Sequence, residues 1–366
     1  MICIFIIIFL SLQKLYFIFL ALIIMSNLNK NARYSLFLLI VFMMIYYYRQ
    51  WTAVPEMIYI EGITMGVVKY NIKYIDKNNR NFKNEIDGIL KNFNDALSTY
   101  IPDSEISRFN QDSTFVFQSP HFLKVLNASK EVYQNTEGAF DVTVAPLVNA
   151  WGFGFKKQQL PDSAKINELR KITGFDKIEF DSKSVRKKNK NVMLDFGGIA
   201  GGYAVDIVVD FLNGKKIDNY MVEIGGELVC KGKTNEDKLW RLGIKNPFYK
   251  QKNQPQLSYI VEVDNRAMNT SGNYENFYIK DGKKYSHTIN PKTGYPENNE
   301  MLSATVFAKT CMIADGYATA FMVLGIKKTK EILEKHKELE VILMFKNEKD
   351  EIETFMSEGI KKYVKQ

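Results

Sequence analysis

The stretch LDFGGIAGGYAVD, residues 194–206, runs from a short apolar strand end through a glycine cluster into a helix. Glycine occupies four of the six positions 197–202, and backbone without side chains can approach a ligand closely. The N-terminus of the helix that follows favours anions, phosphates above all. Tight packing between a strand and a helix produces the same pattern, so this stretch alone leaves both interpretations open.

Hydrophobic periodicity on both sides of this stretch predicts an α+β fold. Apolar residues alternate in 57–74, which predicts two strands, and they recur at helical spacing in 82–97. Asp281-Gly282 separates two short alternating runs and predicts a hairpin. We expect residues 57–366 to form one mixed α/β domain with two lobes. Its further helices are expected near 122–133, after Asp162, and at 200–212, 312–324 and 327–336.

The charge balance argues against a nucleic-acid-binding protein. The net charge is +8, but Lys14, Lys30, Arg33 and Arg49 all precede the first acidic residue, Glu56. Without those four, 45 cations face 41 anions, which leaves +4. The sequence has no nucleic-acid-binding motif, and its three cysteines show neither zinc-site spacing nor a disulfide framework.

Residues 1–53 consist largely of apolar runs, unlike the rest of the chain, and are expected to be an N-terminal hydrophobic signal or anchor region. Residues 34–53 supply roughly the 20 residues that a membrane span needs. Lys30 and Arg33 lie on the N-terminal side of them, which favours an inner-membrane anchor with the rest of the chain on the periplasmic, extracytoplasmic side. An uncleaved anchor is favoured over a cleaved signal. Translation is expected to begin at Met25, which would make residues 1–24 a misassigned start.

Two short motifs contain groups suited to catalysis. Asp315 and Thr319 in IADGYATAFMVLG are four apart, so they share one helix face and offer hard oxygen ligands for Mg²⁺. His287 in YSHTINPKTGYP follows the expected hairpin and precedes a turn at Asn290-Pro291. A neutral imidazole there can take a proton from a hydroxyl nucleophile. The alternatives are an acidic residue near a helix start and a structural histidine.

Taken together, the sequence resembles the ApbE-type FAD:protein FMN transferases over residues 57–340. The resemblance rests on eight motifs in the family's order: TMG at 64–66, STYIPDSEISRFN at 98–110, GAFDVTVAPLVNAWGFG at 138–154, LDFGGIAGGYAVD at 194–206, IGGELVCKG at 224–232, TSGNYENF at 270–277, YSHTINPKTGYP at 285–296 and ADGYATAFMVLG at 314–325.

This resemblance implies an enzyme with FAD as substrate and Mg²⁺ as cofactor. FMN would be joined through its phosphate to a threonine or serine of an acceptor protein, and AMP would leave. The implied acceptors are subunits of membrane redox complexes, of the Na⁺-pumping quinone reductase or Rnf type, or FMN-binding domains.

The resemblance also assigns roles to individual residues. His287 matches the base that deprotonates the acceptor hydroxyl. Asp315 and Thr319 match metal ligands, and Gly198 matches a ligand through its backbone carbonyl. Positions that line the FAD site match Met65, Tyr100, Ala139, Phe140, Asp141, Asp195, Gly201 and Ile289.

Two positions depart from the family pattern. Gly201 stands where the family often has Lys or another polar residue, and Asn290 stands where it usually has Asp. Loss of a carboxylate at position 290 should let His287 stay neutral more easily. Two rival functions remain open: an FAD pyrophosphatase that gives FMN and AMP, and an inactive flavin-binding protein.

Overall fold

The computed structural model describes residues 29–52, 56–154, 160–274 and 276–365, and the chain divides at residue 56 into two units. The first unit contains helix α2 (Lys30–Thr52), which exposes large apolar side chains such as Phe37 and Phe42. Among the described residues, no helix combines the length and apolarity needed to cross a membrane. The anchor expected in residues 1–53 therefore stays a prediction, and residues 1–24 lie outside the described residues.

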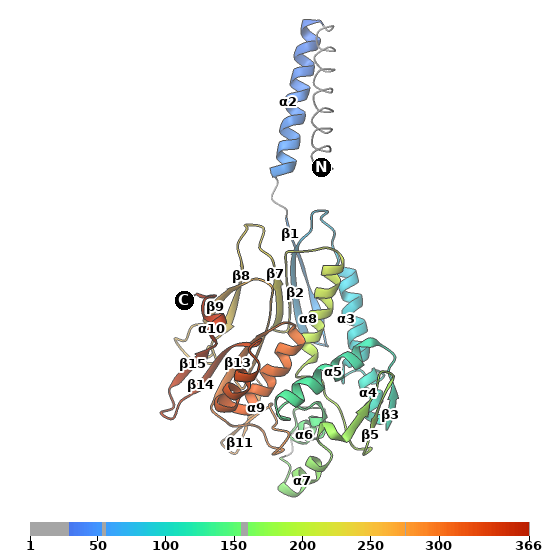
Figure 1. Cartoon of the computed structure of the whole chain (residues 1–366), viewed down its shortest axis with the longest axis vertical. Coiled ribbons are helices and arrows are strands. Elements are labelled where there is room, and N and C mark those ends of the chain that lie inside the picture. Colours follow the sequence, from blue (N-terminus) through green and yellow to red (C-terminus); the bar gives the residue numbers. More distant parts are fainter. Residues whose placement is uncertain (1–28, 53–55, 155–159, 275, 366) are drawn as a thin grey trace. The chain divides into compact units, whose positions relative to one another are not determined.

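An eight-stranded antiparallel sheet forms the centre of the second unit (Figure 1). Its strands lie in the order in which they occur along the chain: β1 (Met57–Thr64), β2 (Val68–Ile75), β6 (Tyr220–Ile224), β7 (Glu227–Lys231), β10 (Arg266–Gly272), β13 (Met301–Ala308), β14 (Glu340–Lys346) and β15 (Ile352–Met356).

Helices cover one face of this sheet and bury the larger core. Alternate residues of β2, Tyr70, Ile72 and Tyr74, point into that core, as the period of a strand requires. The helices are α3 (Lys83–Leu97), α4 (Glu105–Gln111), α5 (Pro120–Asn135), α8 (Ala200–Gly214) and α9 (Cys311–Lys335), with a small sheet of β3 (Thr114–Val116), β5 (Ser184–Lys187) and β4 (Ile178–Phe180) beside them.

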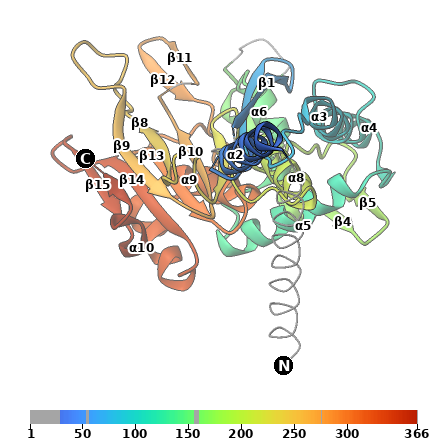
Figure 2. The same ribbon diagram turned by 90° about the horizontal axis from the view of Figure 1, so that it is seen from above.

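A three-stranded sheet packs on the opposite face and buries a second core. Trp240, Leu242 and Ile244 alternate along β8 and meet Leu228 and Met268 of the central sheet. Figures 1 and 2 show β8 and β9 on the side of the central strands opposite α3 and α8. The strands are β16 (Val364–Lys365), β9 (Leu257–Val263) and β8 (Trp240–Lys245), and α10 (Glu358–Lys361) precedes β16.

The remaining elements surround a third, smaller core around Leu147, Trp151 and Ile289. They are the 3₁₀ turn η1 (Val142–Val144), the helices α6 (Ala145–Ala150) and α7 (Ser163–Lys171), and the separate hairpin β11 (Phe277–Lys280) and β12 (Lys283–Ser286). A second 3₁₀ turn, η2 (Phe175–Lys177), packs Phe175 into the larger core.

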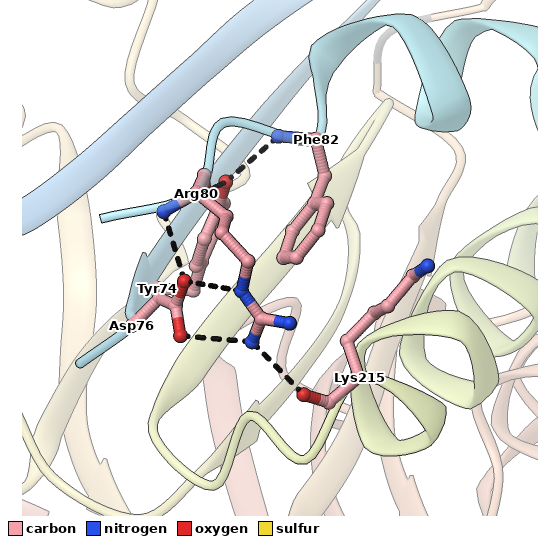
Figure 3. A network of polar contacts seen from close by, with 5 residues as sticks. All are labelled: Tyr74, Asp76, Arg80, Phe82 and Lys215. Atoms are coloured by element: carbon pink, nitrogen blue, oxygen red, sulfur yellow. Dashed lines mark hydrogen bonds and ion pairs between the residues drawn. The ribbon is translucent and has the colours of Figure 1, made fainter. Parts of the chain in front are cut away.

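A polar network fastens the end of β2 to the C-terminus of α8 (Figure 3). The Arg80 guanidinium donates to both carboxylate oxygens of Asp76, at 2.7 and 2.9 Å, and to the Lys215 carbonyl at 3.1 Å. The Phe82 N–H donates to the Tyr74 hydroxyl at 3.0 Å. Arg80 therefore supplies donors to a helix end whose carbonyls lack partners within the helix.

The structure confirms the expected α+β class, with antiparallel sheets and helices. The hairpin forms around Asp281-Gly282, and α3, α5, α7 and α8 lie where helices were expected. The two helices expected at 312–324 and 327–336 are the two parts of α9, which break at Gly325 (φ 72°). The Glu300 carboxylate accepts from the Ile326 N–H there. A division of the second unit into two lobes stays a prediction.

Candidate active site

A cavity of about 1200 Å³ opens between the loop before α8, the N-terminal half of α9, the β6–β7 turn and the segment around the β11–β12 hairpin. Most of the residues assigned from the sequence line it: Ala139, Phe140, Asp141, Asp195, Gly198, His287, Ile289, Asp315 and Thr319. Met65, Tyr100 and Gly201 do not line it. The fold thus brings together motifs that are far apart in the sequence.

One wall of the cavity presents a cluster of oxygen atoms. The Thr319 hydroxyl donates to the Gly198 carbonyl at 3.4 Å, and Asp315 lies one helical turn before Thr319. A Cβ at position 198 would lie 3.0 Å from the Thr319 hydroxyl oxygen, so a side chain there would crowd the cluster. Glycine therefore lets a backbone carbonyl approach Thr319.

Asp315 is buried, and backbone and side-chain donors fix its carboxylate. Oδ2 accepts from the Gly202 N–H at 3.0 Å, and Oδ1 accepts from the Asn269 amide at 2.5 Å. Burial, and then the nearby Glu227 carboxylate, raise the pKa of Asp315 well above its usual range. Burial also raises the pKa of Glu227 to about 7. The two buried acids thus raise each other's cost of ionisation on the same side of the cavity.

The donor set at this wall fits a hard divalent cation. A carboxylate, a hydroxyl and a backbone carbonyl are the oxygen ligands that Mg²⁺ takes, and Asp315 keeps lone pairs beyond its two hydrogen bonds. A cation would also relieve the repulsion between Asp315 and Glu227. Among the described residues, no group of three His, Cys, Asp or Glu side chains could hold a metal. Thr319 and Gly198 would therefore have to complete the site.

His287 lines the same cavity and directly follows β12. Its Nδ1 lies 3.0 Å from the Asn276 carbonyl oxygen, and its backbone N–H donates to the same oxygen at 3.1 Å. A carbonyl only accepts, so Nδ1 carries the proton and Nε2 keeps its lone pair in the neutral ring. Burial lowers the pKa of His287, which keeps the imidazole neutral and able to accept a proton.

Asp141 and Asp195 line the cavity from two segments that a backbone hydrogen bond joins. The Asp195 N–H donates to the Val142 carbonyl at 2.8 Å. Burial raises the pKa of Asp141 to about 6, although its Oδ1 accepts from the N–H and hydroxyl of Thr143. Burial raises the pKa of Asp195 as well. Carboxyl groups that keep a proton closer to neutral pH can donate a hydrogen bond as well as accept one.

Three polar residues near this site were not singled out from the sequence. Glu227 and Asn269 come from β7 and β10 and meet Asp315 only in the fold. Asp206, on α8, accepts from the N–H groups of Cys311 and Met312 at 2.8 and 2.9 Å and so caps α9. The sequence marks these three residues only as polar side chains in segments that are otherwise mostly apolar.

Comparison with known proteins places the chain in a family. A model of the ApbE family matches residues 65–343. The FAD:protein FMN transferases of Vibrio cholerae serotype O1 and Escherichia coli K12 are 38% and 33% identical. These alignments cover 84% and 86% of this chain and 93% and 91% of those proteins. The chain belongs to the ApbE family.

Solved ApbE structures are similar over the same part of the chain. "Flavin Transferase ApbE from Vibrio cholerae" has a TM-score of 0.77 at 38% identity and covers 84% of this chain and 99% of that one. The apo form of the Pseudomonas stutzeri flavinyl transferase ApbE has a TM-score of 0.76 at 30% identity, with 84% and 97% covered.

In this ApbE-family chain, Met65 and Tyr100 lie outside the cavity lining, but contacts connect the Met65 turn to its rim. Met65 has a left-handed backbone (φ 46°) between β1 and β2. The N–H of Gly225, which lines the cavity, donates to the Lys69 carbonyl just after this turn. Tyr100 is 75% exposed in the turn after α3. Both assignments stay predictions.

The two residues that depart from the family pattern, Gly201 and Asn290, each lie next to acidic side chains. A Cβ at position 201 would lie 2.8 Å from Glu227 Oε1 and 3.5 Å from Asp315 Oδ2, so any side chain there would face both acids. Asn290 donates to Glu297 Oε2 at 2.8 Å and accepts from the Lys292 N–H at 2.9 Å. An aspartate at position 290 would oppose Glu297, so Asn290 suits this neighbourhood.

Proposed function

We propose that this chain is an FAD:protein FMN transferase that moves FMN from FAD to a threonine or serine hydroxyl of an acceptor protein. The observation that carries the proposal is the placement of His287 and the Gly198–Asp315–Thr319 oxygen cluster on one cavity. Relatives named FAD:protein FMN transferase, 33–39% identical over most of the chain, support it.

His287 acts as the general base in this proposal. Its Nε2 takes the proton of the acceptor hydroxyl, which is otherwise a weak nucleophile. The hydroxyl oxygen then bonds to the phosphorus of the FMN half of FAD. The bond from that phosphorus to the bridging oxygen breaks, and AMP leaves with the bonding electrons. The Asn276 carbonyl stabilises the imidazolium, because Nδ1–H already donates to it.

Gly198, Asp315 and Thr319 would hold Mg²⁺. The cation supplies charge that stabilises the pyrophosphate and the leaving AMP. The protein fixes the donors beforehand: Gly202 and Asn269 orient Asp315, and Asp206 holds the first turn of α9.

The flavin nucleotide would lie against the residues around Phe140 and Asp195. The cavity of about 1200 Å³ exceeds the usual range for small ligands, as a dinucleotide and an incoming side chain require. Ala139, Phe140, Asp141, Asp195 and Ile289 all line it, and Met65, Tyr100 and Gly201 would act at or beyond its edge.

We further propose that the acceptors belong to membrane redox complexes of the Na⁺-pumping quinone reductase or Rnf type, or are FMN-binding domains. Residues 1–53 would anchor the enzyme in the cytoplasmic membrane with residues 57–366 outside. The exposed apolar side chains of α2, together with Lys30 and Arg33 at its start, support this placement.

The test combines the full chain with FAD, Mg²⁺ and an FMN-binding acceptor domain, and follows AMP release and acceptor mass. AMP together with an FMN-sized mass gain on the acceptor is the expected result. AMP and free FMN without acceptor would make the protein a pyrophosphatase instead. FAD binding without either product would make it an inactive flavin-binding protein.

A further inference from the structure

The β11–β12 hairpin, which leads into His287, forms a two-stranded sheet of its own. A two-stranded hairpin is marginally stable in water unless another part of the protein supports it. His287 follows Ser286, the last residue of β12, directly. The position of the imidazole therefore depends on what holds this hairpin.

Four aromatic rings, here called the aromatic brace, connect the hairpin to the loop after α6. They are Trp151, Phe153, Tyr278 and Tyr285. Trp151 stacks on Tyr285 with 5.6 Å between ring centroids, and Tyr285 stacks on Tyr278 at 5.2 Å. Tyr278 then meets Phe153 at 5.2 Å, and the Phe153 ring lies edge-on to His287 at 6.5 Å. The brace thus runs from the loop after α6, through both strands, to the histidine.

Two hydrogen bonds lock the brace to its surroundings. The Tyr278 hydroxyl donates to the Trp151 carbonyl at 3.1 Å, which ties β11 to the loop after α6. The Trp151 indole N–H donates to the Gly294 carbonyl at 2.7 Å, which ties the same loop to the turn after His287. Trp151 is only 4% exposed, so both bonds are screened from competing water.

We infer that the aromatic brace positions His287 for proton transfer, with Trp151 as the residue that joins the hairpin to the turn at Gly294. This inference rests on the proposed function of His287 as a base. Trp151 and Tyr285 do not line the cavity, so they act on the reaction through His287. A displacement of about 1 Å at a reacting group can cost about a hundredfold in rate.

Trp240 provides a matched control for Trp151. It is also 4% exposed, and its indole N–H also donates to a backbone carbonyl, that of Lys231, at 3.0 Å. Trp240 belongs to the second core and does not line the cavity. Replacing either tryptophan by phenylalanine removes one N–H donor and some ring area, but only Trp151 belongs to the brace.

The experiment compares Trp151→Phe with Trp240→Phe in the full chain. Both should lower the melting temperature by similar amounts. Only Trp151→Phe should lower kcat for FMN transfer, by roughly tenfold, with the KM for FAD within about twofold of wild type. Equal kcat in the two variants, or parallel changes in kcat and KM for Trp151→Phe, would overturn the inference.

Tyr278→Phe is the second variant and keeps the inference testable if Trp151→Phe does not fold. It keeps the stacked ring and removes the bond to the Trp151 carbonyl, so kcat should fall by about threefold to tenfold. Because Tyr278 also lines the cavity, the KM for FAD must stay within about twofold of wild type, and a parallel change in KM would indicate direct contact with substrate instead. Tyr259→Phe is its control, because that hydroxyl donates to Thr354 at 3.0 Å outside the cavity. An unchanged kcat in Tyr278→Phe would count against the brace.

An NMR titration separates failure of the inference from failure of the proposed function. The chain has three histidines, so the His287 ring can be followed with His121 and His336 as internal references. Loosening the brace should raise the pKa of His287 towards its ordinary value, because burial is what lowers it. If wild type transfers no FMN, the proposed function fails. The brace is then judged by whether this rise occurs in Trp151→Phe and not in Trp240→Phe.

Discussion

The two walls of the cavity are held in place by different means. The helical wall consists of the loop before α8 and the N-terminal half of α9, and it contains Asp315 and Thr319. Behind it, the backbones of α8 and α9 meet so closely that Gly202 has no room for a side chain. The hairpin wall consists of β11, β12 and the segment to Pro296 and contains His287. Stacked rings and a few hydrogen bonds hold it.

In the proposed mechanism the helical wall binds the cation, and the hairpin wall supplies the base for proton transfer. The ligands proposed for the cation stand beside residues of the main core, such as Ala314 and Ala318 of α9, and this packing fixes their backbone positions before substrate arrives. The proposed base belongs to a small sheet attached at its side. Each wall can therefore be perturbed with little effect on the other, which makes the comparison open to experiment.

The largest effect is expected at the helical wall. Asp315→Asn keeps the shape but removes the charge, so Mg²⁺-dependent transfer should fall by more than about a hundredfold. Transfer rates measured against Mg²⁺ concentration check this. Asp210→Asn is the control, because this exposed acid of α8 does not line the cavity and contacts none of the proposed ligands. Full activity in Asp315→Asn would exclude it as a ligand.

The hairpin wall should respond differently. His287→Ala should lower kcat by about a hundredfold to ten-thousandfold, as expected for loss of a general base, with little change in FAD affinity. Stopped-flow or single-turnover transfer and equilibrium FAD binding give the two numbers. Equal losses of rate and affinity would mean that the imidazole serves binding rather than proton transfer.

Alanine substitutions at two neighbouring glycines, Gly201 and Gly202, test how closely α8 and α9 pack. A Cβ at Gly202 would lie 2.2 Å from the Cys311 carbonyl oxygen, so Gly202→Ala should destabilise the fold by about 3 kcal/mol. At Gly201 the obstacle is the mobile end of Glu227, so Gly201→Ala should change stability by less than about 1 kcal/mol. Denaturant unfolding measures both, and similar losses would contradict the close contact at Gly202.

The smallest effect is expected at the network of Figure 3, away from both walls. Hydrogen bonds from Arg80 lower the pKa of Asp76 to about 2, below the unfolded value of about 3.9. The network therefore stabilises the fold above pH 4 and is lost as pH falls through 2. Because Arg80 is 41% exposed, Asp76→Asn should cost only about 1–2 kcal/mol.

Unfolding measured between pH 2 and 6 checks this prediction. Wild type should lose more stability than Asp76→Asn as the pH falls, and transfer at neutral pH should be equal in the two proteins. If the free energy of unfolding of Asp76→Asn fell with pH as much as that of wild type, Asp76 would not be the group that titrates.

Local patterns predicted much of the helical wall. The strand, glycines and helix of residues 194–206 and the spacing of Asp315 and Thr319 are short-range features, so periodicity and turn chemistry were sufficient. The family resemblance supplied the roles of these residues and of His287. The break in α9 was foreseen near Gly325, although Glu300, which accepts from the residue after it, was not.

The sequence pattern does not predict which distant residues come into contact. Glu227 and Asn269 approach Asp315 from strands that are distant in the sequence, and Trp151 reaches Gly294 across 143 positions. Such pairs depend on the order of strands in the sheet and leave no periodic signal. The partner of Asn290 was equally hidden, because only the turn geometry brings Glu297 beside it.

The order of strands in the central sheet also has a consequence for synthesis on the ribosome. Since each strand pairs with strands already present in the order of the chain, the sheet can grow along one edge while translation proceeds. The β1–β2 edge can form early, whereas His287 and α9 emerge in the last quarter of the chain. A nascent chain of this protein would therefore gain most of its sheet before it gains the groups proposed here for catalysis.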